Sequence, residues 1–184
     1  MINNYLKNNY AKYFTHYLIK NFASSLFSIF IPIYLYANGF SLFQYGIFYL
    51  VQESVNLCFT FILYKKVHSW GIRNPTIIAV LAQIVLISLT YYYLNSTYTF
   101  LLILAFFRGI HDSFYWGTHG LFIVHLSGKK TGYFLGKWYF LTTIFQTAIV
   151  SVSRYIFDTS SPFWLVIISI LFYGLSILPL IKIR

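Results

Sequence analysis

The sequence is poor in charged residues and contains very few acidic ones. Of its 184 residues, 3 are Asp or Glu and 13 are Lys or Arg, so charged residues make up 9% against 59% hydrophobic residues. So little charge cannot cover the surface of a hydrated globular domain. The net charge of +10 comes from bases scattered over short segments, with no arginine-rich run. This pattern excludes a nucleic-acid-binding protein and favours anionic lipid headgroups as the partners of the bases.

Cysteine is also scarce, and the common signatures of enzymes are missing. The single residue, Cys58, excludes a disulfide framework and a thiolate metal site. The sequence has no Ser-His-Asp order, no glycine loop that cradles phosphate and no nucleophile elbow. We therefore expect neither an enzyme nor a cofactor. The first apolar run follows a polar, Asn-rich segment without a small-residue cleavage site, so we expect an uncleaved membrane span there.

Long apolar runs, in contrast, are abundant. A helix needs about 20 apolar residues to cross a hydrocarbon core about 30 Å thick. The predicted spans are residues 22–37, 42–64, 75–94, 98–126, 133–157 and 162–181, and an earlier start of the first span near Tyr13 is an alternative. The sequence therefore predicts an all-α membrane protein, a single six-helix transmembrane domain over residues 1–184 with a short N-terminal tail over about 1–12.

The positions of the basic residues indicate how these spans are oriented. All Lys and Arg residues except Arg108 and Arg154 lie before the first span, after the sixth or around alternate connectors. Segments rich in Lys and Arg tend to stay in the cytoplasm. We therefore predict a multi-pass protein of the cell membrane with both termini in the cytoplasm, which requires an even number of crossings.

Ionisable residues inside two predicted spans are the first candidates for a functional site. Glu53 lies near the middle of the second span, and Arg108 and Asp112 reach a similar depth in the fourth. A charge at the bilayer centre costs at least roughly 2.5–3.5 kcal/mol on insertion scales, so these groups must pair or line a wet cavity. Arg108 and Asp112 can pair along one helix, and Glu53 could reach the same guanidinium. Two interpretations stay open: a proton or substrate site, and an ion-pair staple between the helices.

Other polar residues recur at helical spacing and therefore share a helix face with these charges. The candidate residues of a substrate or ion pathway are Glu53, Asn56, Arg108, His111, Asp112, Tyr115, His119 and Gln146. For the hydroxyl residues of the first and fifth spans, close helix packing is an equal alternative. We expect no metal site, because His111 and His119 are eight residues apart, whereas helices that bind zinc use a four-residue interval.

Several short motifs follow one another along the chain in a recognisable order. They are Ile31-Pro32-Ile33-Tyr34-Leu35, Gly39-Phe40-Ser41, Gln44-Tyr45-Gly46, the pair Gly71 and Arg73, Arg108-Gly109-Ile110-His111-Asp112, Tyr115-Trp116 with His119, Gly128 through Gly136, and Leu178-Pro179-Leu180. In this order they resemble the amino-terminal half of the major facilitator superfamily of transporters. The family pattern around Gly71 also has an aspartate and an earlier glycine, and both are missing here.

The resemblance implies half of a major facilitator fold, with two three-helix repeats of inverted topology. It implies transport of a small solute by alternating access, coupled to protons, with the first, second, fourth and fifth helices at the pathway. Gly71 and Arg73 would belong to a cytoplasmic gating loop. Since the family's complete transporters have twelve helices, the expected partner is a second six-helix half or a second copy of this chain. The alternatives are an inactive truncated remnant and a membrane scaffold that does not transport.

Overall fold

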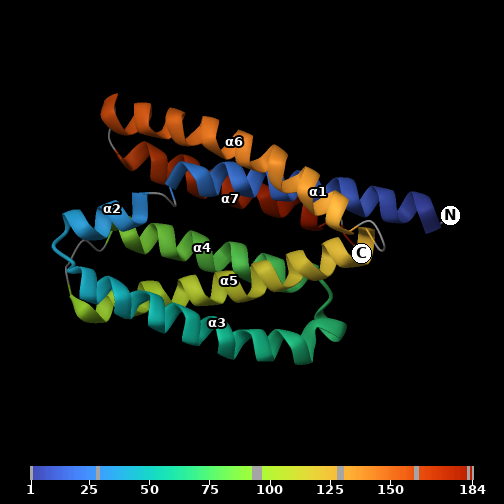
Figure 1. The fold of residues 1–184 in the computed structure, drawn as a ribbon, viewed down its shortest axis with the longest axis horizontal. Coiled ribbons are helices and arrows are strands. Elements are labelled where there is room, and N and C mark those ends of the chain that lie inside the picture. Colours follow the sequence, from blue (N-terminus) through green and yellow to red (C-terminus); the bar gives the residue numbers. More distant parts are fainter. Residues whose placement is uncertain are drawn as a thin grey trace. The chain divides into compact units, whose positions relative to one another are not determined.

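A computed structural model of the chain describes residues 2–27, 30–92, 97–127, 131–159, 162–181 and 183. These residues are helical apart from short turns, which confirms the predicted all-α class. The helices are α1 (Ile2–Phe27), α2 (Phe30–Ala37), α3 (Leu42–Trp70), α4 (Arg73–Tyr92), α5 (Tyr98–Ser127), α6 (Thr131–Thr159) and α7 (Pro162–Ile181) (Figure 1).

The helices agree with the predicted spans from the second span onward. α3 and α5 begin at the predicted residues, and α7 coincides with the predicted span 162–181. The first span differs, because the described residues there form two helices, α1 and α2. α1 begins at Ile2, so the segment predicted as an N-terminal tail is helical. Residues 28 and 29, which would join α1 to α2, lie outside the described residues.

Three of the described helices are long and apolar enough to cross a membrane. They are Leu42–Trp70, Arg73–Tyr91 and Phe163–Ile181, and they indicate a membrane protein. α5 is not among them, since Arg108, His111 and Asp112 interrupt its apolar sequence. Six crossings and the orientation of the chain stay predictions.

Local sequence signals define both ends of α3. At its start, the Ser41 hydroxyl accepts a hydrogen bond from the Gln44 backbone N–H at 3.3 Å. The Gln44 side chain accepts one from the Ser41 N–H at 2.8 Å, which completes a capping box. At its end, Gly71 adopts a φ of 64° and its N–H donates to the Val67 carbonyl at 2.9 Å. Glycine adopts positive φ without steric cost, so Gly71 stops the helix.

Contacts between the helices divide the chain into two compact units. Unit 1 consists of Met1–Phe27 and His119–Arg184, and unit 2 consists of Ser28–Thr118. α5 contributes to both units, since the boundary falls between Thr118 and His119. The single six-helix domain and the inverted repeats stay predictions.

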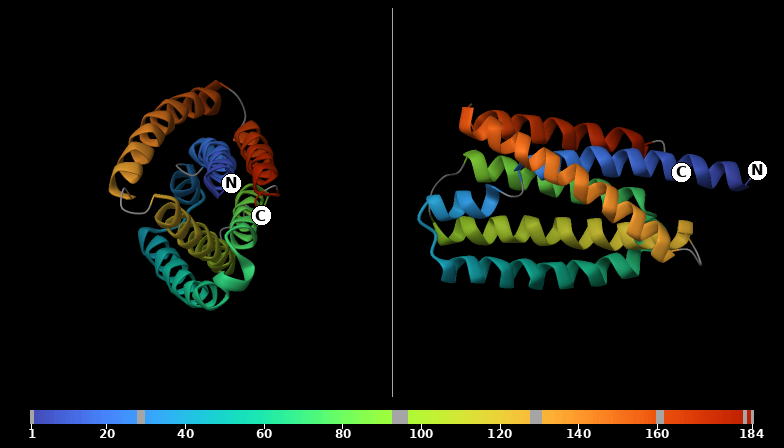
Figure 2. Two further views of the ribbon diagram at one scale, coloured as in Figure 1. Left: turned by 90° about the vertical axis from the view of Figure 1, so that its right-hand side faces the viewer. Right: turned by 45° about the horizontal axis from the view of Figure 1, so that its top comes forward.

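In unit 1, α1 packs along α7 and contacts α6, which crosses it (Figure 2). The core of this unit is rich in aromatic rings: Tyr13, Tyr17 and Tyr173 are buried. His16 is also buried, and its Nδ1 donates to the Ser176 carbonyl oxygen at 2.8 Å. This bond ties the middle of α1 to α7.

In unit 2, α3 and α5 lie side by side (Figures 1 and 2). They approach closely at Gly109, where an added Cβ would lie 2.6 Å from the Gln52 carbonyl oxygen, and at Gly117, where it would lie 2.5 Å from the Leu63 side chain. Ser113 lies midway between these glycines. A small residue at every fourth position is the pattern that lets membrane helices pack closely. This contact brings the polar faces of α3 and α5 together.

Candidate functional site

Asp112 is the centre of a polar network between α3 and α5. The Arg108 Nε donates to its Oδ2 at 3.1 Å, and the His111 Nδ1 donates to its Oδ1 at 2.9 Å. From α3, the Gln52 Nε2 donates to Oδ2 at 3.0 Å. The exposed fractions of the side chains are 11% for Asp112 and 27% for Arg108. Three donors therefore hold this carboxylate in one position inside the unit.

Glu53 lies at the other end of the same network. It accepts hydrogen bonds from the Gln52 Nε2 at 3.3 Å and from the Asn56 Nδ2 at 3.0 Å. Within the described residues it forms no ion pair, so the contact with Arg108 that the sequence allowed is not formed. Glu53 is exposed, whereas Asp112 is buried. Glu53 is thus the acidic group of the network that the surroundings can reach.

Gln52 links the two carboxylates, and the sequence did not single it out. Its Nε2 donates to Asp112 and also to the neighbouring Glu53, and the residue is 6% exposed. A sequence signal did exist, because Gln52 precedes Asn56 by one helical turn and so shares its face. A second link joins the Thr60 and Ser113 hydroxyls at 3.2 Å.

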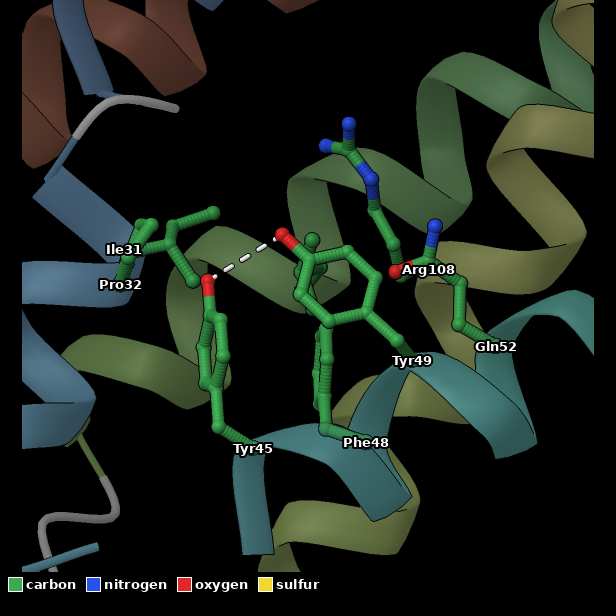
Figure 3. Close-up of a pocket in the computed structure, with 8 residues that line it drawn as sticks. Ile31, Pro32, Tyr45, Phe48, Tyr49, Gln52 and Arg108 are labelled. Atoms are coloured by element: carbon green, nitrogen blue, oxygen red, sulfur yellow. Dashed lines mark hydrogen bonds between the residues drawn. The ribbon is translucent and has the colours of Figure 1, made fainter. Parts of the chain in front are cut away.

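A pocket of about 80 Å³ lies beside this network in unit 2 (Figure 3). Its lining residues come from α2, α3, α4 and α5: Ile31, Pro32, Tyr45, Phe48, Tyr49, Gln52, Leu86 and Arg108. Figure 3 shows the hydroxyls of Tyr45 and Tyr49 pointing toward one another, and they are hydrogen-bonded at 3.3 Å. Gln52 and Arg108 belong to the pocket and to the network at once, so the pocket adjoins the buried carboxylate.

The other predicted pathway residues lie in different surroundings. Tyr115 is fully buried in unit 2, where its ring stacks on His111 with centroids 5.4 Å apart. His119 belongs to unit 1, and its Nδ1 lies 3.2 Å from the Tyr13 hydroxyl. Gln146 lies on α6 in unit 1 and is half-buried. The network thus unites Glu53, Asn56, Arg108, His111 and Asp112, while His119 and Gln146 are not part of it.

Gly71 and Arg73, the predicted gating-loop residues, lie at the junction of α3 and α4. Gly71 ends α3, and Arg73 is the first residue of α4. The exposed Arg73 donates from Nε to the Asn74 side chain at 3.3 Å. The structure assigns them a turn and a surface contact, and a gating role stays a prediction.

Unit 1 contains an aromatic cluster around His119 that the sequence did not reveal. The His119 ring stacks on Tyr17 with centroids 4.7 Å apart and meets Trp138 edge to face at 5.8 Å. Lys20, one turn further along α1, is only 3% exposed. Tyr13, Tyr17 and Lys20 recur at intervals of three and four residues, which is the signal that could have extended the polar face of the first span toward the N-terminus.

Among the described residues, no group of three His, Cys, Asp or Glu side chains could hold a metal ion. No protein-family model, curated protein or solved structure matches the chain.

Proposed function

We propose that this chain forms one half of a secondary active transporter, related to the amino-terminal half of the major facilitator superfamily. It would move a small solute by alternating access, coupled to protons. The observation that supports this most is the network of two carboxylates, a guanidinium and an imidazole on α3 and α5. Ionisable groups inside a membrane are expensive and commonly mark the path of a substrate or proton.

Within the proposed mechanism, the two acidic residues have different tasks. Asp112 stays in place because Arg108, His111 and Gln52 all donate to it. Glu53 exchanges the proton, since it is exposed and its hydrogen-bond donors are neutral amides. A proton on Glu53 removes the negative charge next to the amide that it shares with Asp112 and so weakens the bond from that amide to Glu53. Protonation is therefore felt at the buried carboxylate.

The surroundings of Glu53 favour transport over a purely structural staple. A staple needs the opposite charges on different helices, but Arg108 and Asp112 are both on α5. The bond that joins α3 to α5 at this point comes from the uncharged Gln52. An exposed carboxylate in a membrane helix needs water or another protein beside it. We propose that a second six-helix half supplies the other wall of a wet passage.

Cysteine labelling tests whether water reaches this face of α3. In a Cys58→Ser background, Asn56→Cys lies on the network face, and Leu57→Cys, at a position 60% exposed, is the matched control. A membrane-impermeant methanethiosulfonate added to intact membranes should modify Asn56→Cys quickly and Leu57→Cys at least about tenfold more slowly, because charged reagents do not enter hydrocarbon. Equal protection of both positions would contradict a wet passage.

A further inference from the structure

We infer that the pocket of unit 2 binds a short-chain monocarboxylate, with the guanidinium of Arg108 on the carboxylate and the aromatic wall on the carbon chain. This inference rests on the proposed function, in which the pocket is the part of the substrate chamber that this half contributes. Three features of the lining lead to it: its charge, its apolar wall and its volume.

The charge of the lining selects an anion. Among the described residues that line the pocket, Arg108 is the one charged residue, and Glu53 does not belong to the lining. Arg108 donates to Asp112 through Nε, and within the described residues its terminal Nη groups make no hydrogen bond. A guanidinium offers five N–H donors in a planar fork that matches the two oxygens of a carboxylate. The donors that remain can therefore hold a second carboxylate at the pocket.

Apart from Gln52, whose Nε2 already donates to Asp112, the rest of the wall offers aromatic and aliphatic surface that suits the apolar body of a ligand. Tyr45 and Phe48 stack with centroids 5.9 Å apart, and Leu86 is fully buried. The hydroxyls of Tyr45 and Tyr49 already bond to each other. Ligand pockets combine such apolar walls with a few polar groups that fix orientation. A sugar, with hydroxyls on every side, would leave most of its polar groups without partners against this wall.

The volume sets the size of the ligand. A dry cavity of roughly 150 Å³ can hold benzene, whereas this pocket measures about 80 Å³. A chain of a few carbons beside the carboxylate fits this space better than an aromatic ring. Propionate is therefore a suitable probe, and propionamide is its neutral counterpart of nearly the same shape.

The experiment measures binding of propionate to the detergent-purified chain by saturation-transfer difference NMR. We expect a signal that propionate gives and propionamide does not, because only the carboxylate can engage the fork of Arg108. Arg108→Gln should weaken binding about tenfold or more, as expected for loss of charge-assisted hydrogen bonds. Arg108→Lys keeps the charge paired with Asp112 and should still weaken binding, since an ammonium lacks the fork.

The control is Lys66→Gln, which removes one positive charge from an exposed position of the same unit, outside the pocket. Size-exclusion chromatography checks that each variant is folded. Equal binding of propionate and propionamide, or full binding in folded Arg108→Lys and Arg108→Gln, overturns the inference. If propionate fails to bind while Asn56→Cys is labelled from water, the substrate class is wrong and the passage stands. If propionate binds and Asn56→Cys is protected, the pocket is a carboxylate site without the proposed transport.

Discussion

Asp112 and Glu53 carry the same charge in different surroundings, so their neutral variants should fail in different ways. Asp112→Asn leaves the Arg108 guanidinium without its carboxylate partner. Breaking a buried ion pair costs about 3–5 kcal/mol, and partial exposure reduces this, so we expect a loss of about 2–3 kcal/mol. Glu53→Gln keeps an acceptor oxygen for one of its two donors, Gln52 or Asn56, and should cost about 1 kcal/mol. Thermal unfolding in detergent measures both.

Among folded variants, Glu53→Gln should impair transport more than Asp112→Asn does, which is the opposite of their order in stability. In membrane vesicles from cells that express the chain with its neighbouring genes, Glu53→Gln should abolish the pH dependence of solute uptake, because its amide cannot take up the proton. Lys66→Gln, a change of charge at an exposed position, should leave it intact. If uptake by Glu53→Gln still depends on pH, this residue has no part in the coupling mechanism.

The charged residues of the network could be predicted from the sequence, but their connections could not. Glu53, Arg108 and Asp112 were found because a charge in an apolar run is expensive enough to need a reason. Gln52 was not found, since a neutral amide costs less and its partner lies on another helix. Whether Glu53 contacts Arg108 could not be decided from the sequence, because spacing fixes neighbours along one helix and not the contacts between two.

Packing of α3 against α5 depends on glycines at which a side chain does not fit. At Gly109 the obstacle to a Cβ is the backbone oxygen of Gln52, which cannot rotate away. At Gly117 the obstacle is the end of the Leu63 side chain, which can rotate away. At Gly120 an added Cβ would meet open space. We expect Gly109→Ala to cost about 2–3 kcal/mol and Gly117→Ala about 1 kcal/mol, on the scale of overpacked cores. Gly120→Ala should be neutral or stabilise by up to about 1 kcal/mol, because alanine favours a helix more than glycine does.

Unfolding of the three glycine variants in detergent gives their order, and Gly120→Ala is the matched control because it lies on the same helix. An equal change of stability in all three, in the stabilising direction that the higher helix propensity of alanine predicts, would show that propensity and not the contact with α3 decides the effect. A Gly109→Ala variant as stable as the parent chain would contradict the close approach of α3 and α5.

The ends of the helices show where local sequence is a sufficient guide. α3 begins and ends where a capping box and a glycine of positive φ require it. The start of α1 at Ile2 was not predicted, because its Asn-rich sequence lacks an apolar run. Its burial depends on residues more than a hundred positions away, since His16 bonds to Ser176 of α7 and Tyr13 to His119 of α5. No local pattern records such a contact.

The number of membrane crossings is a property of the whole chain. The side of the membrane on which each terminus lies tests whether this number is odd or even. If only the three described helices that are long and apolar enough to cross did so, an odd count would place the termini on opposite sides of the membrane. The distribution of Lys and Arg predicts six crossings and both termini in the cytoplasm. In unit 1 the start of α1 and the end of α7 lie at the same end of the bundle, as an even count requires (Figures 1 and 2).

Reporter fusions distinguish the two counts. A green fluorescent protein at either terminus should fluoresce, because it folds in the cytoplasm, and alkaline phosphatase fused there should be inactive. Phosphatase inserted after Gly39, in the predicted first outer turn, should be active. Insertion after Gly71, in the basic connector between α3 and α4, should be inactive and is the internal control. Termini on opposite sides would rule out six crossings, and the charged face of α5 would then need a location outside the hydrocarbon core.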